Sequence, residues 1–186
     1  MAIDLLFIHS AGSQAPGSGS SQFLAWLSAE FSTKFNIIAP QMPNPENPIS
    51  EDWQAELSWL FSQLGDRAVV VGHSLGGSSV LKFLSENAVA KDIQGLFVVA
   101  APYWGADSNW DQASFKFSSD EPAEIDKVEK MYIYHSKNDQ VVPFQHQSWY
   151  SEKFPLAMAI SLEGVDHIVS EPAQALIQDL DTMDIA

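Results

Sequence analysis

A serine at position 74 stands between Gly72 and Gly76 in a Gly-x-Ser-x-Gly motif, a pattern that can build a nucleophile. The apolar run at residues 68–71 predicts a buried strand before the motif, and residues 78–84 predict a helix after it. A serine at a sharp turn from strand to helix holds its hydroxyl exposed at the carboxyl edge of a sheet. Glycines on both sides let the strand and the helix cross closely, where a Cβ would clash. We therefore predict that Ser74 is a nucleophile rather than part of an ordinary Gly/Ser turn.

A serine hydroxyl needs a base at neutral pH, and that base is normally a histidine held in one tautomer by a carboxylate. After a strand–turn–helix nucleophile, the expected order along the chain is serine, then acid, then histidine. The chain has five histidines, at positions 9, 73, 135, 146 and 167. Only His167 follows the last predicted strand, in a loop that contains a glycine. We predict His167 as the base.

The other four histidines fit other roles. His9 ends the first predicted strand and would shape the loop that follows it. His73 occupies the variable position of the motif, so its side chain should point away from the nucleophile. His135 lies in or at the end of a strand and favours a structural role, and His146 lies on a predicted helix and is expected to be exposed.

Three carboxylates are candidates for the acid. Asp139 follows the fifth predicted strand in a turn, and it is our choice, although an ordinary Asx turn would also explain it. Asp166 is the second choice, because sequence neighbours such as Asp166 and His167 rarely orient each other's side chains. Glu163 is close as well, but it lies on the wrong side of a turn.

Small residues after the first predicted strand could help to bind an oxyanion, which needs two N–H donors. The residue after the nucleophile, Leu75, should supply one donor, and Ala11, or less favourably Ser10, should supply the other. Ser10 is also a candidate substrate contact. A plain glycine-rich loop is the alternative explanation for this segment.

Aromatic residues gather after the fourth predicted strand and could wall an acyl pocket near Ser74: Tyr103, Trp104, Trp110, Phe115 and Phe117. Of these, we expect Tyr103, Trp104 and Trp110 to contact a substrate. Packing of this loop onto the core would explain the same residues equally well.

The elements that must position these groups are six short apolar segments, separated by helical patterns. The predicted strands lie near residues 3–8, 35–39, 68–72, 95–101, 130–135 and 156–162. Strands that alternate with helices predict βαβ units, a mostly parallel sheet and a three-layer α/β/α sandwich. Every polar cluster of interest follows a predicted strand, which is where open α/β sheets place their sites. The length of 186 residues predicts a single domain over 1–186.

Composition limits the classes of molecule that the protein is expected to bind. The net charge of −15 disfavours nucleic acid and anionic membrane surfaces, so a small-molecule ester or acyl substrate is expected; a protein partner is undefined. The chain has no cysteine, which removes thiolate metal sites and disulfides and fits a cytoplasmic location. No segment reaches the roughly 18 apolar residues of a membrane span. The expected chemistry calls for no metal or organic cofactor.

The motifs around Ser74, at residues 139–143 and at residues 164–167 together resemble the α/β-hydrolase superfamily, over the whole chain. The small size, the lack of a cap insertion and the aromatic loop resemble the small serine hydrolases related to retinoblastoma-binding protein 9. This resemblance implies an α/β-hydrolase fold without a cap domain, a triad of Ser74, Asp139 and His167, and hydrolysis of small carboxylic esters.

Two departures from the superfamily pattern concern loop geometry. Ser10 after His9 replaces a common glycine, and Ser136 replaces a frequent glycine before the acid. Both leave backbone N–H groups in place. The same triad would also serve a thioesterase, an amidase or an acyltransferase. A non-catalytic protein-binding module on a hydrolase fold is the alternative from another class, although three matched polar groups argue against it.

Overall fold

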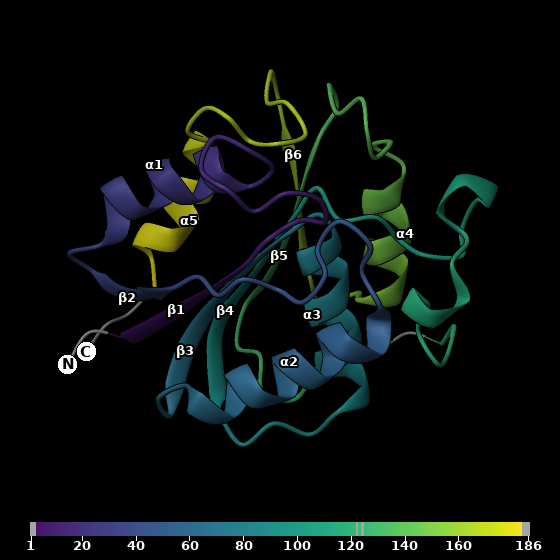
Figure 1. The fold of residues 1–186 in the computed structure, drawn as a ribbon, viewed down its shortest axis with the longest axis horizontal. Helices are drawn as coiled ribbons and strands as arrows, with labels where there is room; N and C mark the ends of the chain where they lie inside the picture. Colours follow the sequence, from purple (N-terminus) through teal and green to yellow (C-terminus); the bar gives the residue numbers. More distant parts are fainter. Residues whose placement is uncertain (1–2, 122, 124, 184–186) are drawn as a thin grey trace.

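A six-stranded parallel sheet forms the centre of the protein, which is described here by a computed structural model over residues 3–121, 123 and 125–183. The strand order is β2-β1-β3-β4-β5-β6 (Figure 1). The elements, in chain order, are β1 (Ile3–Ile8), α1 (Ser21–Phe31), β2 (Phe35–Ile38), α2 (Ser50–Gln63), β3 (Arg67–His73), α3 (Leu75–Glu86), β4 (Asp92–Val99), β5 (Met131–Ser136), α4 (His146–Lys153), β6 (Met158–Leu162) and α5 (Gln174–Asp181). The prediction of six strands alternating with helices is confirmed.

Helices cover both faces of this sheet. α1 and α5 lie together on one face, and α2, α3 and α4 lie on the other, which makes the three predicted layers (Figure 1). Side chains of β1 alternate between the two cores: Leu5 and Phe7 pack with the α1 and α5 layer, whereas Leu6 and Ile8 pack with the α2 and α3 layer. A strand buried on both sides reads as a continuous apolar run because neither face meets water.

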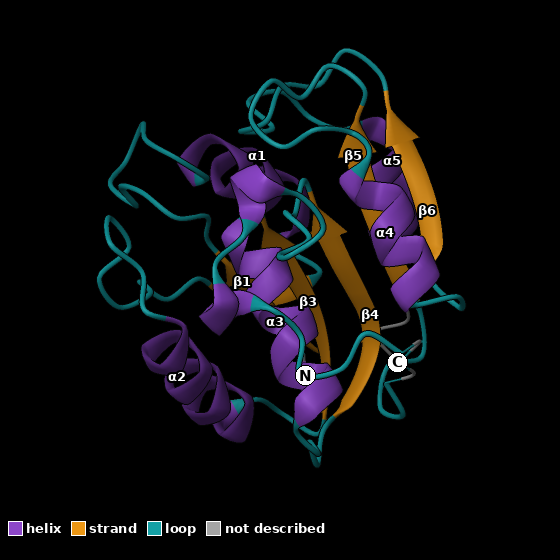
Figure 2. Cartoon of the chain, turned by 90° about the vertical axis from the view of Figure 1, so that its right-hand side faces the viewer, coloured by secondary structure: helices purple, strands orange, loops and turns teal. Residues whose placement is uncertain are grey.

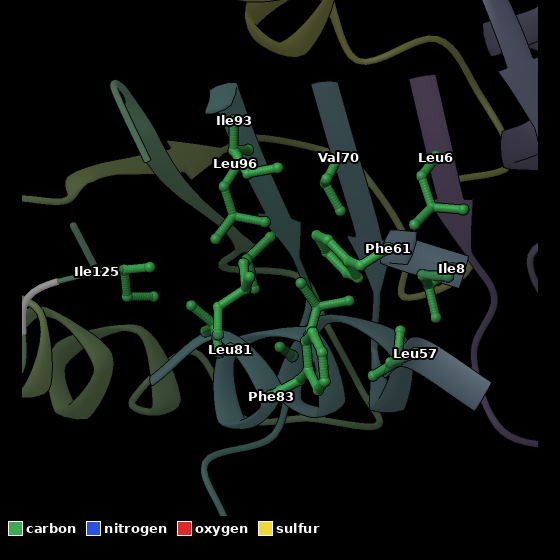
Figure 3. Packing of buried hydrophobic residues seen from close by; sticks show 14 of the residues in the cluster. Leu6, Ile8, Leu57, Phe61, Val70, Leu81, Phe83, Ile93, Leu96 and Ile125 are labelled. Carbon is green, nitrogen blue, oxygen red and sulfur yellow. The ribbon is translucent and has the colours of Figure 1, made fainter. Parts of the chain in front are cut away.

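The core between the sheet and helices α2 and α3 is made of interlocking aliphatic and aromatic side chains. In Figure 3, Val70 and Leu96 of the sheet point toward Phe61 of α2 and Leu81 of α3. All four are buried, with exposed fractions of 4% or less. Burial stabilises each such side chain by about 1.5–3 kcal/mol. This packing fixes α3, and with it the serine that precedes the helix, against the sheet.

The strand order changes direction at β1, and this decides where a site can form. The chain passes from β1 outward to β2 and then returns to place β3 on the other side of β1. Ile8 pairs with Gly72 in the parallel register, so the loops that follow β1 and β3 leave the sheet side by side. Open α/β sheets bind ligands at such a switch point. In Figure 2, the arrowheads of β4 and β6 point to the same end of the sheet, as expected for parallel strands.

Two glycines allow the elements around this point to approach closely. A Cβ at Gly72 would lie 2.7 Å from the Cα of Gly77, so the predicted crossing of strand and helix is tight there. A Cβ at Gly76 would instead overlap the carbonyl oxygens of Ile8 and His9. The second glycine therefore lets α3 approach the end of β1, rather than the strand that precedes the serine.

The largest boundary difference concerns the fourth strand, expected at 95–101 and observed at Asp92–Val99. The strand ends early because Ala100 takes a left-handed backbone conformation, with φ of 53°. It begins early because Asp92 pairs with Arg67 of β3. Both residues are charged, so the apolar pattern used to predict the strand does not include them. Within the described residues, no helix combines the length and apolar character needed to cross a membrane.

Candidate active site

Ser74 lies between β3 and α3 in a strained backbone conformation. Its φ of 51° and ψ of −121° are unusual for a residue with a side chain, and its N–H donates to the Val99 carbonyl at 2.8 Å. Such strain persists only where the surrounding structure holds it, and it clusters at functional sites. The residue is 8% exposed. The turn thus presents the serine hydroxyl at the carboxyl edge of the sheet, as the motif predicts.

Three side chains that are distant in sequence meet at this edge. His167 Nε2 lies 3.1 Å from Ser74 Oγ, and His167 Nδ1 lies 2.8 Å from Asp139 Oδ2. Nδ1 must carry the proton because a carboxylate only accepts, which leaves Nε2 free to accept the serine proton. The arrangement can therefore remove a proton from the hydroxyl and store it on an imidazole whose charge the carboxylate would stabilise.

Asp139 is held by donors on both of its oxygens. The N–H groups of Val141 and Val142 donate to Oδ1 at 2.8 and 2.9 Å, which forms an Asx turn. His135 Nε2 donates to the Val142 carbonyl at 2.8 Å and lies 3.4 Å from Oδ2 of the carboxylate. Burial acts to raise the pKa of Asp139, but hydrogen bonds from His135 and His167 outweigh it and hold that pKa well below its usual range. The Asx turn and the contact with the base thus coexist, each on its own oxygen.

The two alternative acids face other partners. Asp166 accepts hydrogen bonds from the Ser170 N–H at 2.9 Å and from the Ser170 hydroxyl at 2.7 Å. Glu163 pairs with Lys137 at 2.7 Å on the surface. Asp166 therefore shapes the loop that carries His167, and the geometry favours Asp139 as its carboxylate partner.

The two expected oxyanion donors flank the serine. Leu75 is the first residue of α3, where a backbone N–H has no acceptor within the helix. Among the hydrogen bonds of the described residues, none uses the N–H of Ala11, whereas the N–H of Ser10 donates to Ser20 Oγ at 2.8 Å. Ala11 is therefore the better donor of the two candidates in the loop after β1.

A pocket of about 300 Å³ opens beside the serine hydroxyl. Its lining residues are Ser10, Ala11, Gly19, Pro48, Ser74, Leu75, Pro102, Trp104, Trp110, Gln112, Phe115, Val141, His167 and Ile168. The lining contains no Asp, Glu, Lys or Arg. Sequence reasoning missed six of these residues, which lie in irregular segments that no periodic pattern describes: Gly19, Pro48, Pro102, Gln112, Val141 and Ile168. A larger hollow of about 340 Å³ between Ile125 and Phe154 contains none of the groups that meet at Ser74.

Three aromatic rings form one wall of this pocket. Trp104 stacks on Phe115, with ring centroids 5.2 Å apart, and meets the edge of Trp110 at 5.4 Å. The indole N–H of Trp104 donates to Ser78 Oγ at 3.1 Å, which anchors the wall to α3. Both expected functions of this segment, packing and pocket lining, are thus combined in the same rings.

Tyr103 does not line the pocket. Its backbone N–H donates to His146 Nδ1 at 2.8 Å, and its ring packs on Phe117 and Tyr150. The contact with Tyr150 places the Tyr103 ring against α4, and Tyr103 is not among the residues that line the pocket. In this position the Tyr103 side chain does not contact a substrate bound in the pocket beside Ser74.

The expectation that His146 is exposed is wrong, because the residue has no exposed surface. The helix α4 packs its first turn under the rings of Trp110 and Trp149, which cover the imidazole. Burial lowers the pKa of His146 to about 4, so the ring is neutral near pH 7. A short helix with many polar residues gives no sign of which face will be covered.

Comparison with known proteins assigns the family. A family model described as serine hydrolase matches residues 15–174, which contain all three groups that meet at the sheet edge. The chain belongs to the serine hydrolase family. It is also similar to the hydrolase YdeN of Bacillus subtilis, with 30% identity over 122 residues, 63% of this chain and 62% of that protein. The match thus spans less than two thirds of the length of that relative.

Solved structures share the whole architecture. The Bacillus subtilis YdeN structure superposes with a TM-score of 0.76 at 18% identity, over 98% of each chain. A YdeN-like hydrolase from Pectobacterium atrosepticum gives 0.72 at 11% identity, over 98% of this chain and 90% of that one. An α/β-hydrolase from a marine-lagoon metagenome has the same architecture, with a TM-score of 0.70 at 15% identity, over 97% of this chain and 90% of that one. The predicted α/β-hydrolase fold is confirmed.

Proposed function

We infer that this serine hydrolase cleaves small carboxylic esters through an acyl-enzyme on Ser74. One observation carries the proposal: His167 lies within hydrogen-bond reach of both the Ser74 hydroxyl and the Asp139 carboxylate, at 3.1 and 2.8 Å, beside an uncharged pocket. These distances suit proton transfer between a nucleophile, a base and the group that orients the base.

The first half of the reaction forms the acyl-enzyme. Ser74 Oγ attacks the ester carbonyl carbon while His167 Nε2 takes the hydroxyl proton. The N–H groups of Leu75 and Ala11 bind the oxyanion of the tetrahedral intermediate, where one donor is worth about 10²–10³ in rate. When the intermediate collapses, the carbon–oxygen bond to the alcohol breaks and His167 gives its proton to the leaving alkoxide.

The second half uses water in place of the alcohol. Water attacks the acyl carbon and gives a proton to His167 Nε2, and the bond to Ser74 Oγ then breaks. The proton returns to the serine, and the carboxylic acid leaves. Asp139 stays ionised throughout and stabilises the imidazolium in both halves, in keeping with its low pKa.

The pocket supports an uncharged, apolar acyl group as the part of the substrate that binds there. No cationic side chain lines the pocket to pair with a carboxylate or phosphate, and the net charge of −15 repels anions at a distance. The rings of Trp104, Trp110 and Phe115 offer apolar contact area to an acyl chain or ring.

The test is turnover of p-nitrophenyl acetate and butyrate by wild type and by Ser74→Ala, together with labelling of the protein by a fluorophosphonate. We expect the variant to lose at least about 10⁴-fold in kcat and to lose all labelling. Ser79→Ala is the matched control, because Ser79 is a nearby buried serine on α3 whose hydroxyl has no partner among the described residues. Turnover by Ser74→Ala at the wild-type rate would overturn the proposal.

A further inference from the structure

A buried line of hydrogen bonds joins the loop after β1 to the loop after β6. The Ser10 N–H donates to Ser20 Oγ at 2.8 Å, and Ser20 Oγ lies 2.7 Å from His73 Nδ1. His73 Nε2 lies 2.7 Å from the backbone carbonyl oxygen of His167. The exposed fractions of His73 and Ser20 are 0% and 1%. The proposed ester mechanism uses neither the His73 ring nor the Ser20 hydroxyl. The two backbone groups at the ends of the line, the Ser10 N–H and the His167 carbonyl, lie in the loops that carry Ala11 and the base.

The chemistry of the partners fixes the direction of each bond. The His167 carbonyl can only accept, so His73 Nε2 must carry a proton. In a neutral imidazole Nδ1 then has none, so it accepts the proton of the Ser20 hydroxyl. The oxygen of Ser20 in turn accepts the Ser10 N–H. The Ser10 hydroxyl, 2.9 Å from Ser20 Oγ, must donate to that oxygen as well, because the one proton of Ser20 is already given to Nδ1. Every buried polar atom along this line therefore has a partner, and only one tautomer of His73 satisfies them.

The surroundings of His73 keep the ring neutral. Burial lowers its pKa to about 3, and the nearby His167 and His9 lower it as well, against opposing contributions from Asp139 and from the hydrogen bond to the His167 backbone. The Phe23 ring meets its edge with centroids 5.6 Å apart. The direction of the hydrogen bonds thus stays the same across the pH range in which an esterase would be assayed.

The loop that carries His167 needs support from outside. Val169, a β-branched residue, has a φ of 52°, a conformation that costs about 1–3 kcal/mol and persists only where neighbours hold it. Among the described residues, two side chains from the body of the protein donate to backbone carbonyls of this loop: Trp26 Nε1 to Val169 at 2.9 Å and His73 Nε2 to His167 at 2.7 Å. The hydrogen bond from His73 therefore holds the backbone of His167, the predicted base, directly.

We propose that His73 is a positioning residue that aligns the base at His167 and the oxyanion donor at Ala11 with the nucleophile. His73 is the last residue of β3 and immediately precedes Ser74, so it is as rigid as the strand. One of its ring nitrogens holds the base loop directly, and the other holds Ser10, the neighbour of Ala11, through Ser20. The inference rests on the proposed esterase function for its kinetic consequences, but not for its hydrogen bonds.

Variants that remove one bond or both test this role, in the full-length protein with p-nitrophenyl butyrate. His73→Phe keeps a ring but removes both bonds, and we expect kcat to fall about 10²-fold, the effect of displacing reacting groups by about 1 Å. His73→Gln restores a donor near the position of Nε2 and should recover about tenfold of that loss. Ser20→Ala should lower kcat about tenfold, with KM within about twofold in all three, because the pocket wall is unchanged. Ser79→Ala serves again as the control.

Active-site titration with a fluorophosphonate corrects each kcat for unfolded protein, and imidazole ¹⁵N NMR of wild type reports the tautomer. We expect His73 to show a protonated Nε2 and an accepting Nδ1 from pH 5 to 8. A proton on Nδ1, or values of kcat per titrated site no lower than that of Ser79→Ala, would overturn the proposal. If His73→Phe does not fold, Ser20→Ala and the NMR result decide. A wild type without esterase activity would instead refute the proposed function, while the tautomer still tests the hydrogen bonds.

Discussion

Ser74 and His167 line the same 300 Å³ pocket as the aromatic wall, yet the two regions are held in different ways. Ser74, Asp139 and His167 follow three parallel strands, whose ends are fixed by the pairing of the sheet. Trp104 and Trp110 lie in an irregular segment, which is held by side-chain contacts to α3 and α4 instead of by strand pairing. The sheet can thus keep the chemistry constant while the wall changes, so the rate of the reaction and the choice of acyl group should respond to different substitutions.

The largest decrease in kcat among the following three variants is expected from Asp139→Asn, which changes one of the groups held by the sheet. The amide keeps the shape of the side chain but prefers the wrong tautomer of His167, so kcat should fall about 10⁴-fold with little change in KM. Steady-state kinetics on p-nitrophenyl acetate measure this. A loss of less than tenfold would mean that another group orients the base.

A smaller decrease in activity, limited to longer acyl groups, is expected from Trp110→Ala, which removes one ring of the aromatic wall. Removing the ring should lower kcat/KM for butyrate and longer acyl groups about 10–100-fold, while acetate turnover changes little, because a short acyl group makes few contacts there. A panel of p-nitrophenyl esters of increasing chain length measures the profile. Trp59→Ala is the control, since Trp59 is 57% exposed on α2. An equal loss for all chain lengths would show that the wall and the chemistry are not separable.

The smallest effect is expected from Asp166→Asn, which separates the loop-shaping carboxylate from the one on the base. Its hydrogen bonds to Ser170 contribute about 1 kcal/mol or less to stability, because the residue is exposed. We expect kcat within about twofold of wild type and a small decrease in Tm, measured on the same preparation. A loss as large as that of Asp139→Asn would make Asp166 the acid after all.

Local patterns were sufficient for most of the fold. The six strands and their helices could be predicted because apolar runs and helical spacing are properties of neighbouring residues. Gly72 and Gly76 could be recognised as sites of close approach, but the partner of Gly76 could not, since it is the end of β1 and lies 67 to 68 residues earlier in the sequence. Similarly, the buried position of His146 depends on two tryptophans, one of which comes from another segment.

By itself, the sequence determined the nucleophile candidate at Ser74, the order of the three site residues and the parallel sheet, because each follows from a short motif or a repeating pattern. Only the tertiary structure decided which of three carboxylates faces His167, that Tyr103 turns away from the pocket, and that His73 connects Ser20 with the base loop. The physical reason is distance along the chain. The partners in these contacts are separated in sequence by 28, 43, 53 and 94 positions. Packing of the whole sheet brings them together, and no local pattern carries that information.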